Sequence, residues 1–73
     1  MPDTERTCEA LEVGTQLHHL ALMYWSEGRP DDASRVGHQA ARILERECPG
    51  SALLAEVRST VGEIELERGK LAS

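Results

Sequence analysis

The sequence predicts an all-α fold of three antiparallel helices, in which a helical hairpin is covered by a third, capping helix. Two observations carry this prediction. From residue 17 to residue 41, apolar and small residues recur at i, i+3, i+4 and i+7 on both sides of Gly28, which is typical of two helices that fold back on each other. After a second interruption at Pro49 and Gly50, another segment with helical spacing follows, and both connections are short enough to require antiparallel neighbours.

The first helix is expected from about residue 5 to residue 27, with Asp3 or Thr4 as its cap. Its apolar positions keep a helical period: Ala10, Val13, Leu17, Leu20, Ala21 and Tyr24. Gly14 interrupts that period at a cost of about 1 kcal/mol relative to alanine. The segment is therefore either one long helix or a short turn joined to a better helix that starts near Thr15. Gly28 ends the helix, because glycine adopts the left-handed conformation at little cost.

The second helix is expected from about residue 31 to residue 47, and the third from about residue 52 to residue 68, ending at Gly69. Pro30 is tolerated in a first helical turn, and Ser51 can cap the third helix. The second helix has a thin apolar stripe: Ala33, Val36, Gly37, Ala40, Ile43 and Leu44. The third helix is apolar on one face, at Leu53, Leu54, Val57, Val61 and Ile64, and charged elsewhere. The residues that we expect to be largely buried are Leu20, Tyr24, Ala33, Ala40 and Leu44.

The 73 residues form one domain at most, and they include no Phe, one Trp and one Tyr. The core must therefore be aliphatic, which leaves little material for the walls of a deep ligand pocket. No catalytic constellation is visible, because His18 and His19 point about 100° apart on a helix, neither cysteine belongs to a CxxC pair, and no phosphate-binding glycine loop occurs. We expect no enzyme activity, no cofactor and no metal site.

The chain is acidic, with eight Lys and Arg against thirteen Asp and Glu and a net charge of −5. This balance disfavours nucleic acid, whose phosphates reward clustered cations, and it disfavours anionic membrane surfaces. The longest uncharged apolar run, from Leu20 to Trp25, is far below the roughly 20 residues of a membrane span. No basic segment followed by an apolar stretch occurs near residue 1, so the predicted location is the cytoplasm.

Cys8 and Cys48 each lie 20 residues from Gly28, one on either side of the turn. If both helices run uninterrupted, the two cysteines reach a similar height, and a disulfide can close the open end of the hairpin. The alternative is two small, half-buried thiols, because cytosolic cysteines are normally kept reduced. The sequence leaves both interpretations open.

The hairpin resembles the tetratricopeptide repeat (TPR) family, whose first helix has the pattern W-x2-L-G-x2-Y. The matching residues are Leu17, Leu20, Ala21 and Tyr24, then Gly28, Ala33, Ala40 and Pro49. Sliding the sequence by 41 residues places Gly28 on Gly69, so the third helix resembles a degraded second copy of the first. Leu17 and Gly37 stand where the family has Trp and an aromatic residue. The resemblance implies one TPR-like domain over residues 1–73, and a piece of a longer repeat array would have the same pattern.

The resemblance also implies a non-catalytic protein–protein interaction module that binds a peptide or a helix of a partner protein. In this family one flank of the first helix lines a peptide-binding groove. The residues that we predict to contact the partner lie on that flank: His18, Leu22, Trp25 and Arg29. Trp and Arg are enriched in binding hot spots. Three alternatives stay open: Leu22 and Trp25 pack against the third helix, the flank pairs two copies as a homodimeric docking element, or the cysteines and histidines form a thiol- or metal-linked regulator.

Overall fold

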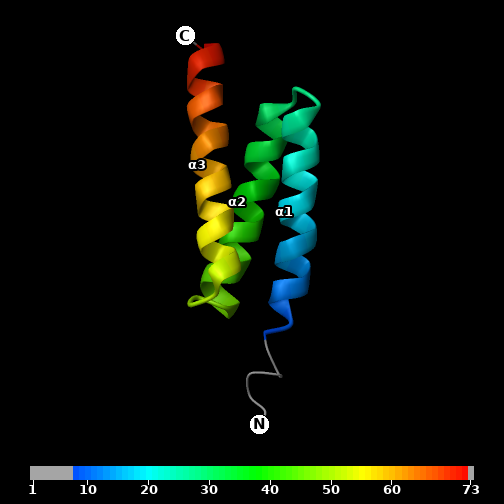
Figure 1. The fold of residues 1–73 in the computed structure, drawn as a ribbon, viewed down its shortest axis with the longest axis vertical. Coiled ribbons are helices and arrows are strands. Elements are labelled where there is room, and N and C mark those ends of the chain that lie inside the picture. Colours follow the sequence, from blue (N-terminus) through cyan, green and yellow to red (C-terminus); the bar gives the residue numbers. More distant parts are fainter. Residues whose placement is uncertain (1–7, 73) are drawn as a thin grey trace.

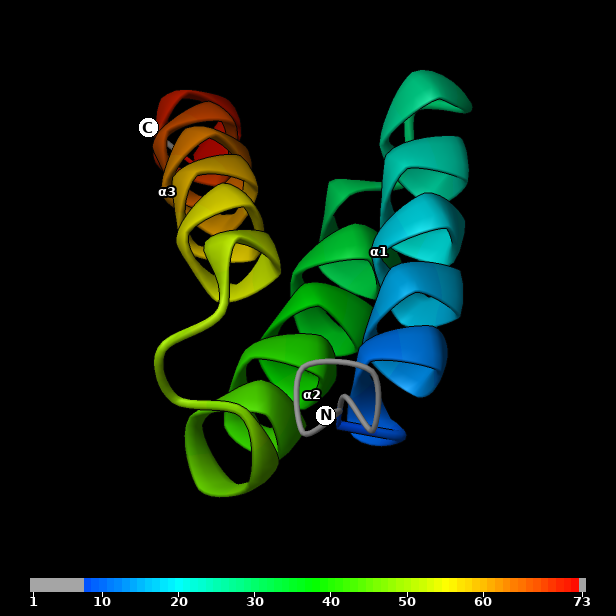
Figure 2. The same ribbon diagram turned by 60° about the horizontal axis from the view of Figure 1, so that its bottom comes forward.

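The computed structural model describes residues 8–72, which form three α-helices and no strand (Figure 1). α1 spans Ala10–Ser26, α2 spans Pro30–Glu47 and α3 spans Ala52–Ala72. Consecutive helices run antiparallel, and α2 lies between α1 and α3 both in Figure 1 and in Figure 2. α1 and α3 each pack mainly against α2 and contact each other much less. The prediction of an all-α hairpin with a third helix is confirmed.

Two of the predicted helix ends are wrong. α1 begins at Ala10, and the two residues before it, Cys8 and Glu9, are not helical. The earlier part of the predicted first helix, with its expected caps, lies outside the described residues. α3 continues past Gly69 to Ala72. Gly69 keeps the negative φ of a helix, whereas Gly28 has a φ of 78°. A glycine ends a helix only where the following chain must turn, and after Gly69 the helical backbone simply continues.

The turn between α1 and α2 forms as the sequence predicts. Gly28 adopts its positive φ, and its N–H donates a hydrogen bond of 3.0 Å to the carbonyl oxygen of Trp25. Pro30 is the first residue of α2, where an N–H would have no helical partner. At the other connection the Ser51 hydroxyl accepts a hydrogen bond of 3.2 Å from the Leu54 N–H, which confirms the predicted cap of α3.

The core is centred on α2, whose small residues let both neighbouring helices approach closely. Three of the predicted core residues are fully buried: Ala33, Ala40 and Leu44. A Cβ atom at Gly14 of α1 would lie 2.8 Å from a methyl group of Leu44, and a Cβ atom at Gly37 would lie 2.8 Å from a methyl group of Val61 in α3. Gly14 is therefore a point of close contact in a continuous α1, and it does not break the helix.

The predicted apolar stripe of α1 is correct at Ala21, which is fully buried, but its large residues lie toward the exposed side. Leu20, which was expected in the core, is 37% exposed, Val13 is 48% exposed, and Tyr24 is only half-buried. The residues of α1 that are buried are Gly14, His18 and Ala21. The physical reason is the close approach of α2, since only small side chains fit between two helices at this distance. Leu20 is therefore turned to the outer flank of the hairpin.

Cys8 and Cys48 form a disulfide, with their Cα atoms 6.0 Å apart. Of the two interpretations that the sequence allows, the structure has the bonded one. The bond joins the residues just before α1 to the end of α2, so it closes the hairpin at the end opposite Gly28. Cys48 is also buried and belongs to the same apolar cluster as Leu44 and Val57.

Candidate interaction site

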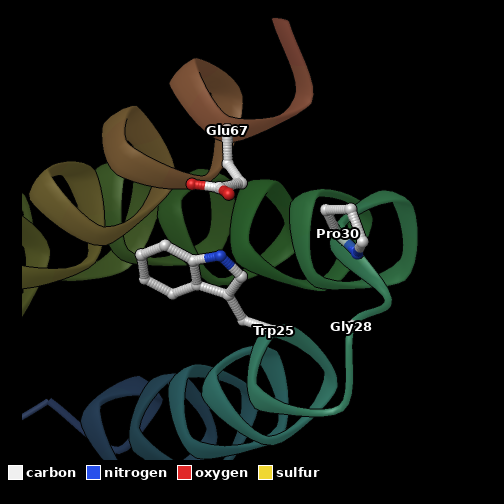
Figure 3. A pocket seen from close by; sticks show the side chains of 4 residues that line it. All are labelled: Trp25, Gly28, Pro30 and Glu67. Atoms are coloured by element: carbon white, nitrogen blue, oxygen red, sulfur yellow. The ribbon is translucent and has the colours of Figure 1, made fainter. Parts of the chain in front are cut away.

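The predicted binding flank leads to a pocket at the end of the molecule where α1 turns into α2. The pocket has a volume of about 290 Å³ and is lined by Trp25, Gly28, Pro30 and Glu67 (Figure 3). Figure 3 shows the Trp25 indole reaching from α1 toward α3, and the Glu67 side chain extending from α3 on the opposite side. The turn and the first residue of α2 complete the wall. We refer to this hollow as the Trp25 pocket.

Local structure explains why the pocket forms here. Trp25 follows Ala21 by four residues and His18 by seven, so it lies on the buried face of α1 at the last helical turn. Gly28 has no side chain, and nothing lies within 4 Å of the place where its Cβ would be, so this side of the pocket is open. Because α3 runs on past this level, Glu67 closes the far side. The indole is half-buried and keeps part of its surface open to a ligand.

His18 does not belong to an exposed flank of α1, where the sequence analysis placed it. Its side chain is buried, with 8% exposed, and its Nε2 atom is 2.9 Å from the Thr60 hydroxyl, with which it shares a hydrogen bond. This bond connects α1 with α3, two helices that otherwise touch little. The reason is again the phase of α1: His18 lies on the same face as Gly14 and Ala21, and that face is the core.

Leu22 and Arg29 have different surroundings from each other. Leu22 is 37% exposed, and it lies one helical turn before Trp25 on the α3 side of α1. Arg29 is exposed but points to the other side of the turn, where its guanidinium lies 4.8 Å from the centre of the Tyr24 ring and 2.7 Å from a carboxylate oxygen of Asp32. Of the four predicted residues, the structure brings only Leu22 and Trp25 to one accessible surface.

The pocket residues beyond Trp25 were not identified as site residues from the sequence. Gly28 and Pro30 were recognised only as turn residues, and Glu67 was assigned to the charged, outward face of the third helix. Glu67 follows Thr60 by seven residues, which is two helical turns, so the two residues share one flank of α3. The sequence alone does not show that this flank faces α1, which follows only from the contact of Thr60 with His18.

The opposite flank of α3 is fixed to α2 by ionic contacts. Arg68 contacts Asp31 at 3.0 Å and Glu65 at 2.8 Å, and Arg58 contacts Glu45 at 2.8 Å. The Ser34 hydroxyl donates a hydrogen bond to Glu65, and His38 and Arg68 also bind that carboxylate. These contacts, the Ser34 hydrogen bond first, hold the pKa of Glu65 below its ordinary value. The contacts of Arg68 join α3 to α2 next to Glu67 of the Trp25 pocket.

Other kinds of site have little support in the described part of the chain. No group of three or more His, Cys, Asp or Glu residues within residues 8–72 is arranged to hold a metal ion. Among the helices described, none is both long enough and apolar enough to cross a membrane. Neither observation concerns residues 1–7.

The chain matches no protein-family model, no curated protein and no solved structure. Its function is therefore inferred from its own residues and their geometry.

Proposed function

We propose that this chain is a non-catalytic protein-interaction module that binds a peptide or a helix of a partner protein beside Trp25, between α1 and α3. The observation that carries the proposal is a half-buried tryptophan that lines an open pocket of about 290 Å³, with the exposed Leu22 one turn away. Large apolar side chains in pockets between helices are typical anchors for a ligand. The resemblance to TPR proteins supports the same proposal, because in that family first helices line peptide-binding grooves.

The experiment compares capture of partner proteins from an extract of the source cell by three forms of the chain. The Trp25→Ala variant should lose the partner, because truncation of a tryptophan at a hot spot weakens binding by roughly 30-fold or more. Met23→Ala is the matched control, since Met23 lies on the same helix, is 56% exposed and does not line the pocket. This control should capture the partner as the parent does.

Circular dichroism of each variant separates lost binding from lost folding. Trp25→Ala should keep the helical signal, because the indole is only half-buried and the pocket is open. Equal capture by the parent and by folded Trp25→Ala would contradict the proposal. If Trp25→Ala unfolds, Leu22→Ala tests the same surface without touching the pocket wall, and undiminished capture by that variant would contradict it equally.

Self-association is a second candidate function, and a specific observation favours it. Val13 and Leu20 are exposed and Leu17 and Tyr24 are half-buried, at i, i+4, i+7 and i+11 along α1. This outer stripe, on the flank away from the Trp25 pocket, would suit pairing of two copies better than the Leu22 and Trp25 flank does. Light scattering after size exclusion tests it: a dimer that Leu20→Glu converts to a monomer supports self-association, and a monomeric parent excludes it.

We also propose a cytoplasmic location, although the disulfide between Cys8 and Cys48 counts against that location. Disulfides persist in oxidising compartments and are rare in the cytosol. The same bond favours the third hypothesis, a thiol-linked regulator, in which the pairing of Cys8 with Cys48 depends on the redox conditions. Counting free thiols in the protein as isolated under denaturing, acid-quenched conditions decides the point. A count of two free thiols per chain supports a cytoplasmic location, and a count of zero supports an oxidising compartment.

A further inference from the structure

A row of unpaired negative charges lies on one flank of α3. The carboxylates between α2 and α3 are matched by cations: Asp31 and Glu45 of α2 and Glu65 of α3 contact Arg68, Arg58 or His38. Three other carboxylates of α3 are exposed and take part in no ion pair among the described residues: Glu56, Glu63 and Glu67. Glu9 and Glu12 are also exposed and in no ion pair of the described chain, but they lie at the start of α1, away from the Trp25 pocket.

These three carboxylates lie on the flank of α3 that faces the Trp25 side of α1. Together with Thr60 they occupy positions i, i+4, i+7 and i+11, which is one side of a helix. Two of the four positions are placed by contacts, since Thr60 bonds to His18 of α1 and Glu67 lines the Trp25 pocket. Glu56 and Glu63 continue the same line. The acidic wall extends over eleven residues, or about 16 Å along the helix.

Beside the Glu63 and Glu67 end of this row, α1 has the exposed Leu22 and the half-buried Trp25. The hydrogen bond between His18 and Thr60 joins the two helices further along, toward Glu56. A ligand that lies over this face of α1 and α3 therefore meets large apolar groups at the Trp25 end and a row of negative charges along α3. No ion pair of the described chain neutralises that row. A complementary ligand therefore carries positive charges at about the spacing of these carboxylates.

We propose that a basic amphipathic segment of about three helical turns binds over this face, along the row of glutamates and the Trp25 pocket. Its Lys or Arg residues face Glu56, Glu63 and Glu67, and one large apolar side chain enters the Trp25 pocket. This inference rests on the proposed function and adds the chemistry of the partner. A second copy of this chain is a poor ligand for this face, because each copy would present the same row of carboxylates and like charges repel.

The test uses defined peptides in place of an unknown partner. Three fluorescein-labelled helical peptides of about 12 residues share one apolar face with a single Trp or Leu anchor, and their polar positions are filled with Lys, with Gln or with Glu. Fluorescence anisotropy measures the binding of each peptide to the full chain. The Lys peptide should bind best, and its Kd should rise several-fold between about 0.05 M and 0.5 M salt, because exposed charges are screened at high salt.

Two triple variants, which change the net charge by the same amount, show which carboxylates the Lys peptide contacts. Glu56→Gln, Glu63→Gln and Glu67→Gln together should weaken the Lys peptide roughly tenfold, since one exposed ion pair contributes a factor of about 2 to 3 in Kd. Control replacements at Glu9, Glu12 and Glu47, which are exposed and lie at the other end of the molecule from the Trp25 pocket, should change the Kd by less than about twofold. Circular dichroism confirms that both variants are folded.

The outcomes separate this inference from the proposed function. If the Gln or Glu peptide binds as tightly as the Lys peptide, and Trp25→Ala still abolishes that binding, the basic partner is wrong and the interaction site stands. Equal weakening by the two charge variants overturns the inference as well, because the effect is then one of net charge. If no peptide binds, the inference is overturned, and the capture experiment with Trp25→Ala then decides on the proposed function.

Discussion

Replacing Gly37 with alanine tests the close approach of α2 and α3, which sets where α3 lies beside the Trp25 pocket. In a helix the change from glycine to alanine is favourable by about 1 kcal/mol. At Gly37, however, the new Cβ would lie 2.8 Å from a methyl group of Val61, which is 9% exposed. Valine is β-branched and has one strongly preferred rotamer in a helix, so this methyl group cannot turn away. Overpacking of this kind costs about 1–3 kcal/mol.

Gly62 supplies the matched control, because it lies inside α3 and nothing is within 4 Å of the place where its Cβ would be. The helix contribution is the same in both variants, so the difference in unfolding free energy between Gly62→Ala and Gly37→Ala is the steric cost alone. We expect Gly62→Ala to be the more stable variant by about 1–3 kcal/mol. For a domain of this size the melting temperatures should differ by roughly 4 °C or more.

Urea denaturation followed by circular dichroism measures both free energies, and a double variant completes the test. Replacing Val61 with alanine in the Gly37→Ala background removes the offending methyl groups, so the two changes together should cost less than the sum of each alone. If Gly37→Ala stabilises the chain as much as Gly62→Ala does, the two helices are further apart than described. The position of α3 beside the Trp25 pocket would then differ from the one described.

Three further predictions concern the core, the disulfide and pH. Leu44→Ala should cost about 2–5 kcal/mol of stability, whereas Leu20→Ala should cost about 1 kcal/mol or less, because Leu44 is fully buried and Leu20 is 37% exposed; equal urea midpoints would contradict the burial pattern. Reducing the disulfide, which closes a loop with a sequence separation of 40, should cost about 4 kcal/mol, and urea midpoints that are the same with and without reductant would refute it. The pKa of Glu65 in the folded chain lies below its ordinary value of 4.5, so its contribution to the free energy of unfolding is present above pH 4.5 and is lost as the pH falls through the folded pKa. Glu65→Gln should therefore reduce the loss of stability at acid pH. An unchanged acid dependence would contradict the contacts of Glu65.

The sequence predicts the hairpin well, because its signals are local. Gly28 and Pro30 act through their own backbone preferences, and Ser51 caps α3 through a contact three residues away. The small residues of α2 also indicate that another helix packs closely against it. None of these inferences requires knowledge of which side of α1 that neighbour occupies.

The phase of α1 could not be obtained in the same way. The predicted stripe of α1 combined the large residues Leu17, Leu20 and Tyr24 with Ala21, and Gly14 was read only as an interruption. The structure has two faces here, one with the large residues and one with Gly14 and Ala21. The second is buried, because the distance between α1 and α2 is set by Gly14 against Leu44, a contact between residues far apart in the sequence.

The candidate site was predicted in part, for the same reason. Trp25 and Leu22 were found because large apolar residues on a flank are visible in the sequence. His18 was misplaced together with the phase of α1, and Glu67 was overlooked because its flank is defined only by the position of α3. The disulfide depended on redox conditions that spacing does not encode, although the equal distances of the two cysteines from Gly28 made it geometrically reasonable.

The most direct test of the interaction site uses the single tryptophan of the chain, whose indole N–H gives one separate signal in a ¹H–¹⁵N spectrum. Titration of labelled protein with the Lys-rich peptide should shift this signal to saturation. The amide signals of Thr60, Glu63 and Glu67 should shift with the same Kd, and those of Val13 and Leu20 should stay in place. If the Val13 and Leu20 signals move while the indole signal does not, the partner binds the outer stripe of α1, and the Trp25 pocket is not the site.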